Sequence, residues 1–226
     1  MQYTKAKLIG YTTPVLDIGV KLGDVKELIA YCARVSNPSN QNNTATTDKL
    51  LNYLIKHKHW SPFEMASATV EIETTRDIAR QLLRHRSFSF QEYSQRYADP
   101  TKDLTFVLRE ARLQDQTNRQ NSIKLDTNSE DEDVQFLIYE WNRRQQEVID
   151  LVRENYSWAV NAGIAKEQAR SILPEGNTMS KLYVQGTLRS FIHYIEVRTE
   201  EGTQLEHQEL AFAVAKAIAG VFNLKG

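Results

Sequence analysis

The segment from Arg84 to Tyr97 carries too many polar side chains to form a core strand or a core helix. Its fourteen residues include three arginines, one histidine, one glutamate, three serines and two tyrosines. Immediately upstream, apolar residues recur at helical spacing and predict a helix over Thr75–Arg86. That helix would align Arg76, Arg80 and Arg84 along one face, so the fold has to place this segment at a surface or at a site.

The aligned arginines have two interpretations. Like charges four residues apart destabilise a helix in water by roughly 0.2–0.5 kcal/mol per pair. An anion lying across them would reverse that effect, and guanidinium groups bind phosphate well because several donors lie in one rigid plane. Alternatively, the arginines form a solvated basic face that pairs with Asp77, Glu92 or acidic residues elsewhere in the chain. The segment alone leaves both interpretations open.

Length and composition limit the class of protein. A chain of 226 residues and 26.1 kDa is expected to form one domain, residues 1–226, with a sizeable core. Its 28 basic and 29 acidic residues nearly balance, which disfavours a surface built for nucleic acid. The single cysteine, Cys32, cannot form an internal disulfide and fits a reducing compartment. No signal-peptide pattern and no apolar run of about 20 residues is found, so we expect a cytoplasmic protein with no membrane partner.

Hydrophobic periodicity predicts both strands and helices. Strands are expected at Tyr3–Tyr11, Ala66–Glu73, Leu104–Leu108 and Lys181–Val184. Helices are expected at Val25–Val35, Asp48–His57, Thr75–Arg86, Val134–Val160, Ala165–Leu173, Leu188–Arg198 and Leu210–Phe222. The polar, acid-rich segment 113–133 has little to bury and is predicted to be a mobile surface insertion.

Some local features suggest structural roles. Ser61 and Glu64, with a proline between them, have the spacing of a capping box at a helix start. Thr47 and Thr187 are expected to cap the helices that follow them. Cys32 is expected on the buried stripe of its helix, which favours a packing role over a nucleophilic one.

The polar segment is part of a longer pattern, Gln-x-x-Arg-His-Arg followed by Glu-Tyr-Ser-x-Arg-Tyr. This pattern resembles the signature of the flavin-dependent thymidylate synthases, and a motif of this length rarely arises by chance. In this chain it is formed by Gln81, Arg84, His85, Arg86, Glu92, Tyr93, Ser94, Arg96 and Tyr97.

Further blocks resemble the same family, and all the motifs together span about residues 28–210. The run Ala33–Ser36 resembles the family's early segment. His59–Glu64 is similar to the family's His-x-Ser/Thr-Pro-Phe-Glu-His block. Ala169–Pro174 is similar to its Ala-Arg-x-x-Leu-Pro block, and Leu188–Arg198 resembles its flavin-binding helix. The chain departs from the family pattern at three positions. Met65 stands where the family has histidine, and Thr187 and His193 stand where the family often has asparagine.

The resemblance implies an α+β fold, a single domain in which a mixed or antiparallel sheet is flanked by long helices. It also implies a methyltransferase, a flavin-dependent thymidylate synthase of nucleotide biosynthesis. In that reaction dUMP becomes dTMP, methylenetetrahydrofolate donates the carbon, and FAD reduced by NADPH donates the hydride. No enzyme cysteine acts as nucleophile, and the active sites are shared between the subunits of a homotetramer.

The same resemblance implies a set of site residues. Flavin contacts are expected from His59, Ser61, Glu64, Arg84, His85, Arg86, Glu92, Thr187, Arg189 and His193. The nucleotide is expected to contact Gln81, Arg84, Glu92, Tyr93, Ser94, Gln95, Arg96, Arg170 and Arg198. Of these, Arg198 and Ser94 are the candidate catalytic residues. Arg198 would stabilise negative charge on the uracil ring, whereas Ser94 has no evident activating base and is expected to position the substrate.

Other classes of protein stay open on the sequence. The arginines of the polar segment, with Phe88, Phe90 and Tyr93 as stacking platforms, would suit a nucleic-acid-binding module. A flavin- or nucleotide-binding protein without activity is a second alternative. The chain has no glycine-rich phosphate loop, which disfavours a Rossmann or P-loop enzyme. His57 and His59 lack cysteine or acidic partners at ligand spacing, so no metal is predicted.

Overall fold

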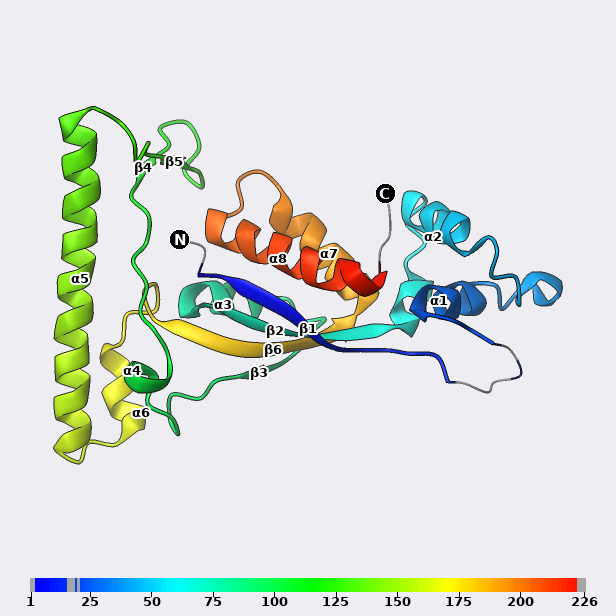
Figure 1. Ribbon diagram of the computed structural model, residues 1–226, viewed down its shortest axis with the longest axis horizontal. Helices are drawn as coiled ribbons and strands as arrows, with labels where there is room; N and C mark the ends of the chain where they lie inside the picture. The colour runs from blue at the N-terminus through cyan, green and yellow to red at the C-terminus, as the bar shows by residue number, and fades with distance from the viewer. Residues whose placement is uncertain (1–2, 16–18, 20, 223–226) are drawn as a thin grey trace.

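A four-stranded sheet forms the centre of the computed structural model, which describes residues 3–15, 19 and 21–222. The strand order is β1-β2-β6-β3, and every recorded pair is antiparallel. The strands are β1 (Lys5–Tyr11), β2 (Ser67–Thr75), β6 (Met179–Thr187) and β3 (Ser89–Glu92). Figure 1 shows β6 and β2 running side by side through the middle of the molecule. The antiparallel sheet with flanking helices confirms the predicted α+β class.

The two faces of the sheet differ because side chains alternate along each strand. On β2, Ala68, Val70 and Ile72 are buried against two helices, α7 (Leu188–Thr199) and α8 (Leu205–Phe222), which cover one face (Figure 1). The opposite face is polar: Glu71 on β2 and Lys181 on β6 form an ion pair of 2.9 Å. The main core therefore lies between the sheet and α7 and α8.

Helices also stand at both ends of the sheet (Figure 1). At one end lie α1 (Val25–Ala33), η1 (Pro38–Asn40), α2 (Thr47–Lys56) and η2 (Ser61–Met65). At the other lie α3 (Arg76–Leu82), α4 (Pro100–Asp103), α5 (Glu132–Asn161), α6 (Lys166–Ala169) and η3 (Arg170–Ile172). A second, smaller core forms between α5, α6 and η3, centred on Tyr156 and Leu173.

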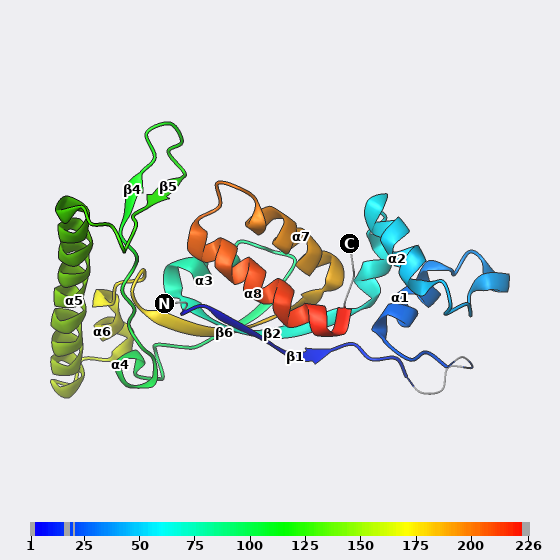
Figure 2. The same ribbon diagram turned by 45° about the horizontal axis from the view of Figure 1, so that its top comes forward.

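Much of α5 faces solvent. Its largest exposed apolar side chains include Phe136 and Trp158, each 65% exposed, and Tyr139 at 62%. Beside α5, the segment predicted as a mobile insertion forms a hairpin of β4 (Arg112–Gln114) and β5 (Ser122–Lys124), which projects from the body in Figure 2. Asp115 in its turn accepts hydrogen bonds from the backbone of Thr117 and Asn118. The mobility of this segment and the single-domain assignment stay predictions.

The helix predicted over Thr75–Arg86 is shorter than expected, because α3 ends at Leu82. Phe88 is buried, and its ring packs 4.8 Å from that of Phe191. A helix continuing through Arg86 would carry Phe88 away from this core, so the chain turns and enters β3 instead. The long-range packing of one aromatic residue overrides the local helical pattern.

Four other local predictions were wrong. Ser61 forms no capping box: η2 starts after Trp60 without a side-chain cap, and Glu64 bonds a residue on α7. Thr47 is the first residue of α2 and not its cap. Leu104–Leu108 makes only an isolated bridge, because Phe106 packs toward the second core. Cys32 is half-buried, since the buried residues of α1 are Val25, Ile29 and Ala30. The cap at Thr187 is confirmed by a bond from the Ser190 amide.

Replacing Gly186 by alanine is expected to destabilise the protein by about 1–3 kcal/mol. A Cβ atom at Gly186 would lie 2.3 Å from Cδ1 of Phe88, whose ring is held by Phe191. Denaturant unfolding measures the change. Gly220→Ala on α8 is the matched control, because nothing lies within 4 Å of its Cβ position and alanine favours a helix. Equal stability of the two variants would contradict the assigned packing.

Candidate active site

A cavity of about 330 Å³ brings together two of the blocks that the sequence singled out. Across it, Nη1 of Arg189 donates to Oε1 of Glu64 at 2.6 Å. This bond, followed by one from Thr187, lowers the pKa of Glu64. The cavity thus joins η2 to the first turns of α7. Its lining residues are Trp60, Glu64, Ser87, Arg189, Ser190, Ile192, His193 and Glu196.

Other predicted flavin contacts lie outside this lining. Arg84 and Arg86 are exposed on the turn before β3, on either side of the half-buried His85. Ser61 is exposed, and His59 is exposed with its ring 6.0 Å from that of Tyr53. The structure therefore groups Glu64, Arg189 and His193, but it does not bring all the predicted flavin residues of one chain into one cavity.

Arg198 is held by His85. Its Nε donates to Nε2 of His85 at 2.9 Å, and the His85 ring stands edge-on to Tyr194 at 5.0 Å. Burial, followed by the nearby charges of Arg198 and His193, lowers the pKa of His85 to about 4. His85 is therefore neutral at pH 7 and accepts through Nε2. The two terminal nitrogens of Arg198 have no recorded partner among the described residues.

The arginine face of α3 is largely neutralised by acids. Arg76 lies 3.4 Å from Glu92 and 3.7 Å from Glu175, and Arg80 lies 3.5 Å and 3.6 Å from the same carboxylates. Ser180 donates a further bond of 2.9 Å to Glu92. Pairing with acidic residues thus accounts for Arg76 and Arg80. Glu92 is hydrogen-bonded within this network and does not line the cavity of about 330 Å³.

The remaining nucleotide residues form a separate cluster near α6. Arg96 pairs with Glu167 at 3.2 Å, and Nε of Arg170 donates to the backbone carbonyl of the same residue at 3.4 Å. Gln95, next to Arg96 in the chain, is only 3% exposed, and its Nε2 has no hydrogen-bond partner in the described part of the chain. Ser94 accepts a long bond of 3.4 Å from the Arg96 amide, and no base is hydrogen-bonded to it among the described residues. Arg96 and Arg170, two side chains suited to binding phosphate, therefore lie together beside Glu167.

Tyr93, also a predicted nucleotide contact, does not belong to this cluster. Its hydroxyl donates to Asp103 at 2.8 Å, and burial followed by that bond raises its pKa. A phenol held by a carboxylate within the chain is poorly placed to reach a nucleotide in this conformation.

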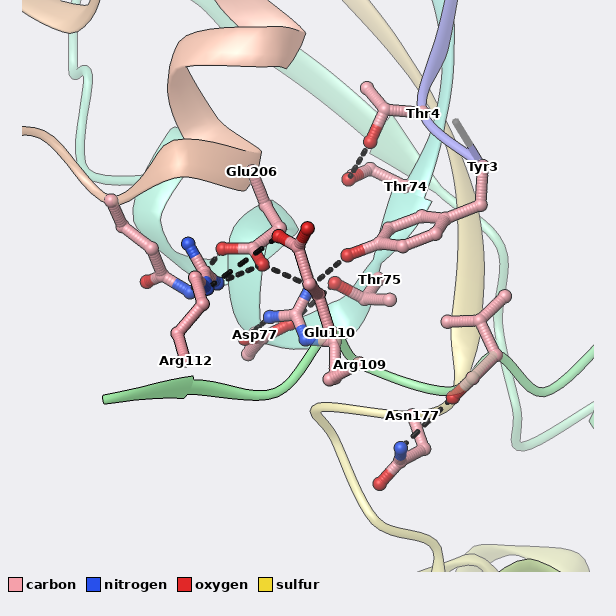
Figure 3. Close-up of polar contacts among 12 residues, drawn as sticks. Tyr3, Thr4, Thr74, Thr75, Asp77, Arg109, Glu110, Arg112, Asn177 and Glu206 are labelled. Atoms are coloured by element: carbon pink, nitrogen blue, oxygen red, sulfur yellow. Dashed lines mark hydrogen bonds and ion pairs between the residues drawn. The ribbon is translucent and has the colours of Figure 1, made fainter. Parts of the chain in front are cut away.

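Sequence reasoning missed a buried polar network, which Figure 3 shows. Arg109 binds Asp77 at 2.5 Å and the hydroxyl of Tyr3, and it lies 3.9 Å from Glu206. Arg112 pairs directly with Glu206. Burial raises the pKa of Tyr3 to about 12. The network ties Tyr3, just before β1, and residues of α3 and α8 to β4 and the irregular segment that precedes it. No periodic pattern in the sequence connects these residues.

A larger cavity of about 850 Å³ lies between the hairpin, α5 and the start of α8. Among its lining residues are Arg119, Lys124, Trp141 and Gln204. Gln204 is also bonded to Gln81, a predicted nucleotide contact, so the cavity adjoins the candidate site.

No group of three metal-ligating side chains occurs in the described part of the chain, and none of its helices has the length and hydropathy of a membrane span.

The free energy of unfolding is expected to fall as the pH decreases from about 6.5 toward 4. Folding lowers the pKa of His85 to about 4 and that of His207 to about 3, chiefly by burial. The unfolded chain therefore binds more protons in this range, so stability present above about pH 6.5 is lost on acidification. Denaturant unfolding should show a shallower loss for His207→Gln than for wild type. An equal loss would contradict this account, and His57→Gln, at an exposed position, is the control.

The fold and the site define an α+β protein with a candidate site for an anionic ligand. The family model described as thymidylate synthase complementing protein matches residues 20–222. A probable flavin-dependent thymidylate synthase of Paramecium bursaria Chlorella virus 1 is 51% identical over 208 residues, which cover 92% of this chain and 90% of that protein. The flavin-dependent thymidylate synthase of Synechocystis sp. is 47% identical over 211 residues, 93% of this chain and 92% of the relative.

A solved structure is also similar. The UMP/dUMP methylase PolB from Streptomyces cacaoi, bound with 5-Br dUMP, has a TM-score of 0.75 and 25% identity, and the match covers 96% of this chain and 90% of PolB. The chain belongs to the flavin-dependent thymidylate synthase family, as its signature predicted.

Proposed function

We propose that this protein is a flavin-dependent thymidylate synthase that methylates dUMP to dTMP. Methylenetetrahydrofolate supplies the carbon, and NADPH is the reductant. The single observation that carries the proposal is the Arg198 guanidinium. Its Nε is held by a neutral imidazole, while its terminal nitrogens have no partner among the residues that the structure describes. The terminal N–H groups of such a guanidinium can donate hydrogen bonds to negative charge that develops on a uracil ring.

The residues present fit part of an FAD. Glu64 and Arg189 offer an acceptor and several donors across the smaller cavity, as the mixed polar edge of a flavin ring requires. The volume of about 330 Å³ is at the low end of the range of roughly 300–1,000 Å³ for small-molecule sites. The rest of a dinucleotide would lie outside it, and the exposed Arg84 and Arg86 are suited to its phosphates.

When bound, FAD supplies the hydride that completes the methyl group. Arg84, Arg96 and Arg170 would hold the nucleotide phosphate, while Arg198 stabilises negative charge on the uracil as C5 becomes electron-rich. No enzyme thiol is needed. Burial raises the pKa of the half-buried Cys32, which disfavours the thiolate that a nucleophile requires.

A homotetramer with shared active sites is part of the proposal. Arg96 and Arg170 cluster on Glu167 near α6, whereas Glu64 and Arg189 line the smaller cavity. Contributions from different subunits would complete a site that one chain leaves divided. Subunit contact would also cover the exposed apolar residues of α5. Light scattering should give the mass of four chains of 26.1 kDa each.

The near balance of charge and the lone cysteine support a cytoplasmic protein that binds no nucleic acid. The test starts with the visible spectrum of the purified protein. We expect flavin absorbance that NADPH bleaches, and dTMP when dUMP and methylenetetrahydrofolate are added.

A colourless protein that takes up no added FAD would contradict the proposal. Salt-sensitive binding of random oligonucleotides would then favour the nucleic-acid module. A yellow protein that makes no dTMP would favour the inactive flavin-binding alternative.

A further inference from the structure

A short chain of amide groups links Gln81 on α3 to a buried carboxylate on α8. Nε2 of Gln81 donates to Oε1 of Gln204 at 2.7 Å, and Nε2 of Gln204 donates to Oε2 of Glu206 at 3.0 Å. On its other side, Oε1 of Gln81 lies 3.1 Å from Nδ1 of His207. Both polar atoms of the Gln81 amide are therefore engaged by residues at the start of α8.

The negative charge of Glu206 gives this chain a direction. Glu206 is 5% exposed and pairs with Arg112, with Arg109 at 3.9 Å. An ionised carboxylate only accepts hydrogen bonds, so Gln204 has to turn its NH₂ group toward Glu206 and its carbonyl toward Gln81. The opposite orientation of Gln204 would place a carbonyl oxygen against the carboxylate.

The same logic fixes Gln81. Because the Gln204 carbonyl accepts, Gln81 turns its NH₂ group toward Gln204 and its carbonyl toward His207. Neutral His207 then carries its proton on Nδ1 and donates to that carbonyl. The amide of Gln81 is left with one N–H and one carbonyl lone pair in fixed positions, and these are the groups that it can offer to a ligand.

We propose that Gln204 and Glu206 are positioning residues, which hold the Gln81 amide in the orientation that binds dUMP. This inference rests on the proposed function, in which Gln81 contacts the nucleotide. A flipped Gln81 would present an acceptor where the nucleotide needs a donor and a donor where it needs an acceptor. Losing the relay therefore weakens nucleotide binding and leaves flavin binding unchanged, because neither Gln204 nor Glu206 lines the smaller cavity.

A double-mutant cycle tests the relay, with Gln204→Met, Gln81→Met and the double variant. Methionine keeps the length of glutamine and removes both amide groups, and the exposed position of Gln204 tolerates it. We expect Gln204→Met to raise the Kd for dUMP about fivefold, as the loss of one hydrogen bond implies. In the Gln81→Met background the same change should have no further effect.

The matched control is Gln208→Met. Gln208 lies in the first turn of α8, four residues after Gln204, and its amide donates to the backbone carbonyl of Glu200 at 2.8 Å instead of to Gln81. Its Kd for dUMP should equal that of wild type. Flavin fluorescence gives the Kd for FAD, which should be the same in all variants and shows that each is folded.

Two results would overturn the positioning role while the proposed function stands. One is a Gln204→Met protein that binds dUMP as wild type does. The other is an equal loss of affinity with and without Gln81, which would mean that Gln204 acts independently. A folded, flavin-loaded wild type that binds no dUMP would instead overturn the proposed function, and the inference with it.

Discussion

Arg198→Lys is expected to slow methyl transfer by about a hundredfold or more, even at saturating dUMP. Removing one preorganised donor to a developing oxyanion typically costs roughly 10²–10³ in rate. Lysine keeps the positive charge but loses the planar guanidinium with its several donors. Negative charge spread over the uracil ring is then stabilised at one point only. It also loses the Nε that His85 fixes. Binding of FAD and dUMP and reduction by NADPH should persist.

Single-turnover methyl transfer with pre-reduced flavin measures this effect directly. Arg170→Ala is the comparison, because Arg170 is assigned to holding dUMP and not to activating it. Loss of a ground-state contact raises KM, so Arg170→Ala should recover at high dUMP concentration while Arg198→Lys should not. A rate for Arg198→Lys equal to that of wild type would show that Arg198 is not the activating residue.

Arg189→Leu is expected to weaken FAD binding by roughly one to two orders of magnitude. A hydrogen bond to a charged group contributes about 1.5–3 kcal/mol, and each 1.4 kcal/mol is a factor of ten in Kd. Leucine retains part of the aliphatic stem but leaves Glu64 without its 2.6 Å partner beside the cavity. Titration of the apoprotein with FAD, followed by flavin fluorescence, gives the affinity.

The control for Arg189→Leu is Arg144→Leu. Arg144 also pairs with a carboxylate, Glu140, at 3.2 Å, but it lies on α5 outside the cavity. If both variants bind FAD as wild type does, the Glu64–Arg189 pair is not part of the flavin site. If Arg144→Leu loses FAD as well, the effect is not specific to the cavity.

The parts of the fold that depend on local pattern could be predicted from the sequence. Alternation along β2 and the helical spacing of Leu188–Arg198 correspond to β2 and α7, and Thr187 caps α7 as expected. The end of α3 could not be predicted in this way. The end of this helix depends on the packing of Phe88 against Phe191, about a hundred residues further along the chain. Local helix propensity contains no information about such a contact.

The candidate site shows the same division. Its residue types were predicted from the signature, but their partners were not. Gln81 meets Gln204 and His207 across 123 and 126 positions, and Arg109 meets Asp77 across 32. Such pairs join α3 to residues at or just before the start of α8 and to the segment before β4, and they form only when the chain is folded. The pairing of Arg76 with Glu92 was one of two open readings, which the sequence could not decide because both used the same arginines.

The central claim is that this protein methylates dUMP with a reduced flavin and without an enzyme thiol. It is tested most directly by anaerobic single-turnover chemistry in the Cys32→Ala protein, loaded with pre-reduced FAD, dUMP and methylenetetrahydrofolate. We predict dTMP in an amount equal to the bound flavin, formed at nearly the rate of wild type, because Cys32 is half-buried and its pKa is raised by burial. A folded, flavin-loaded Cys32→Ala protein that forms no dTMP while wild type does would contradict the claim.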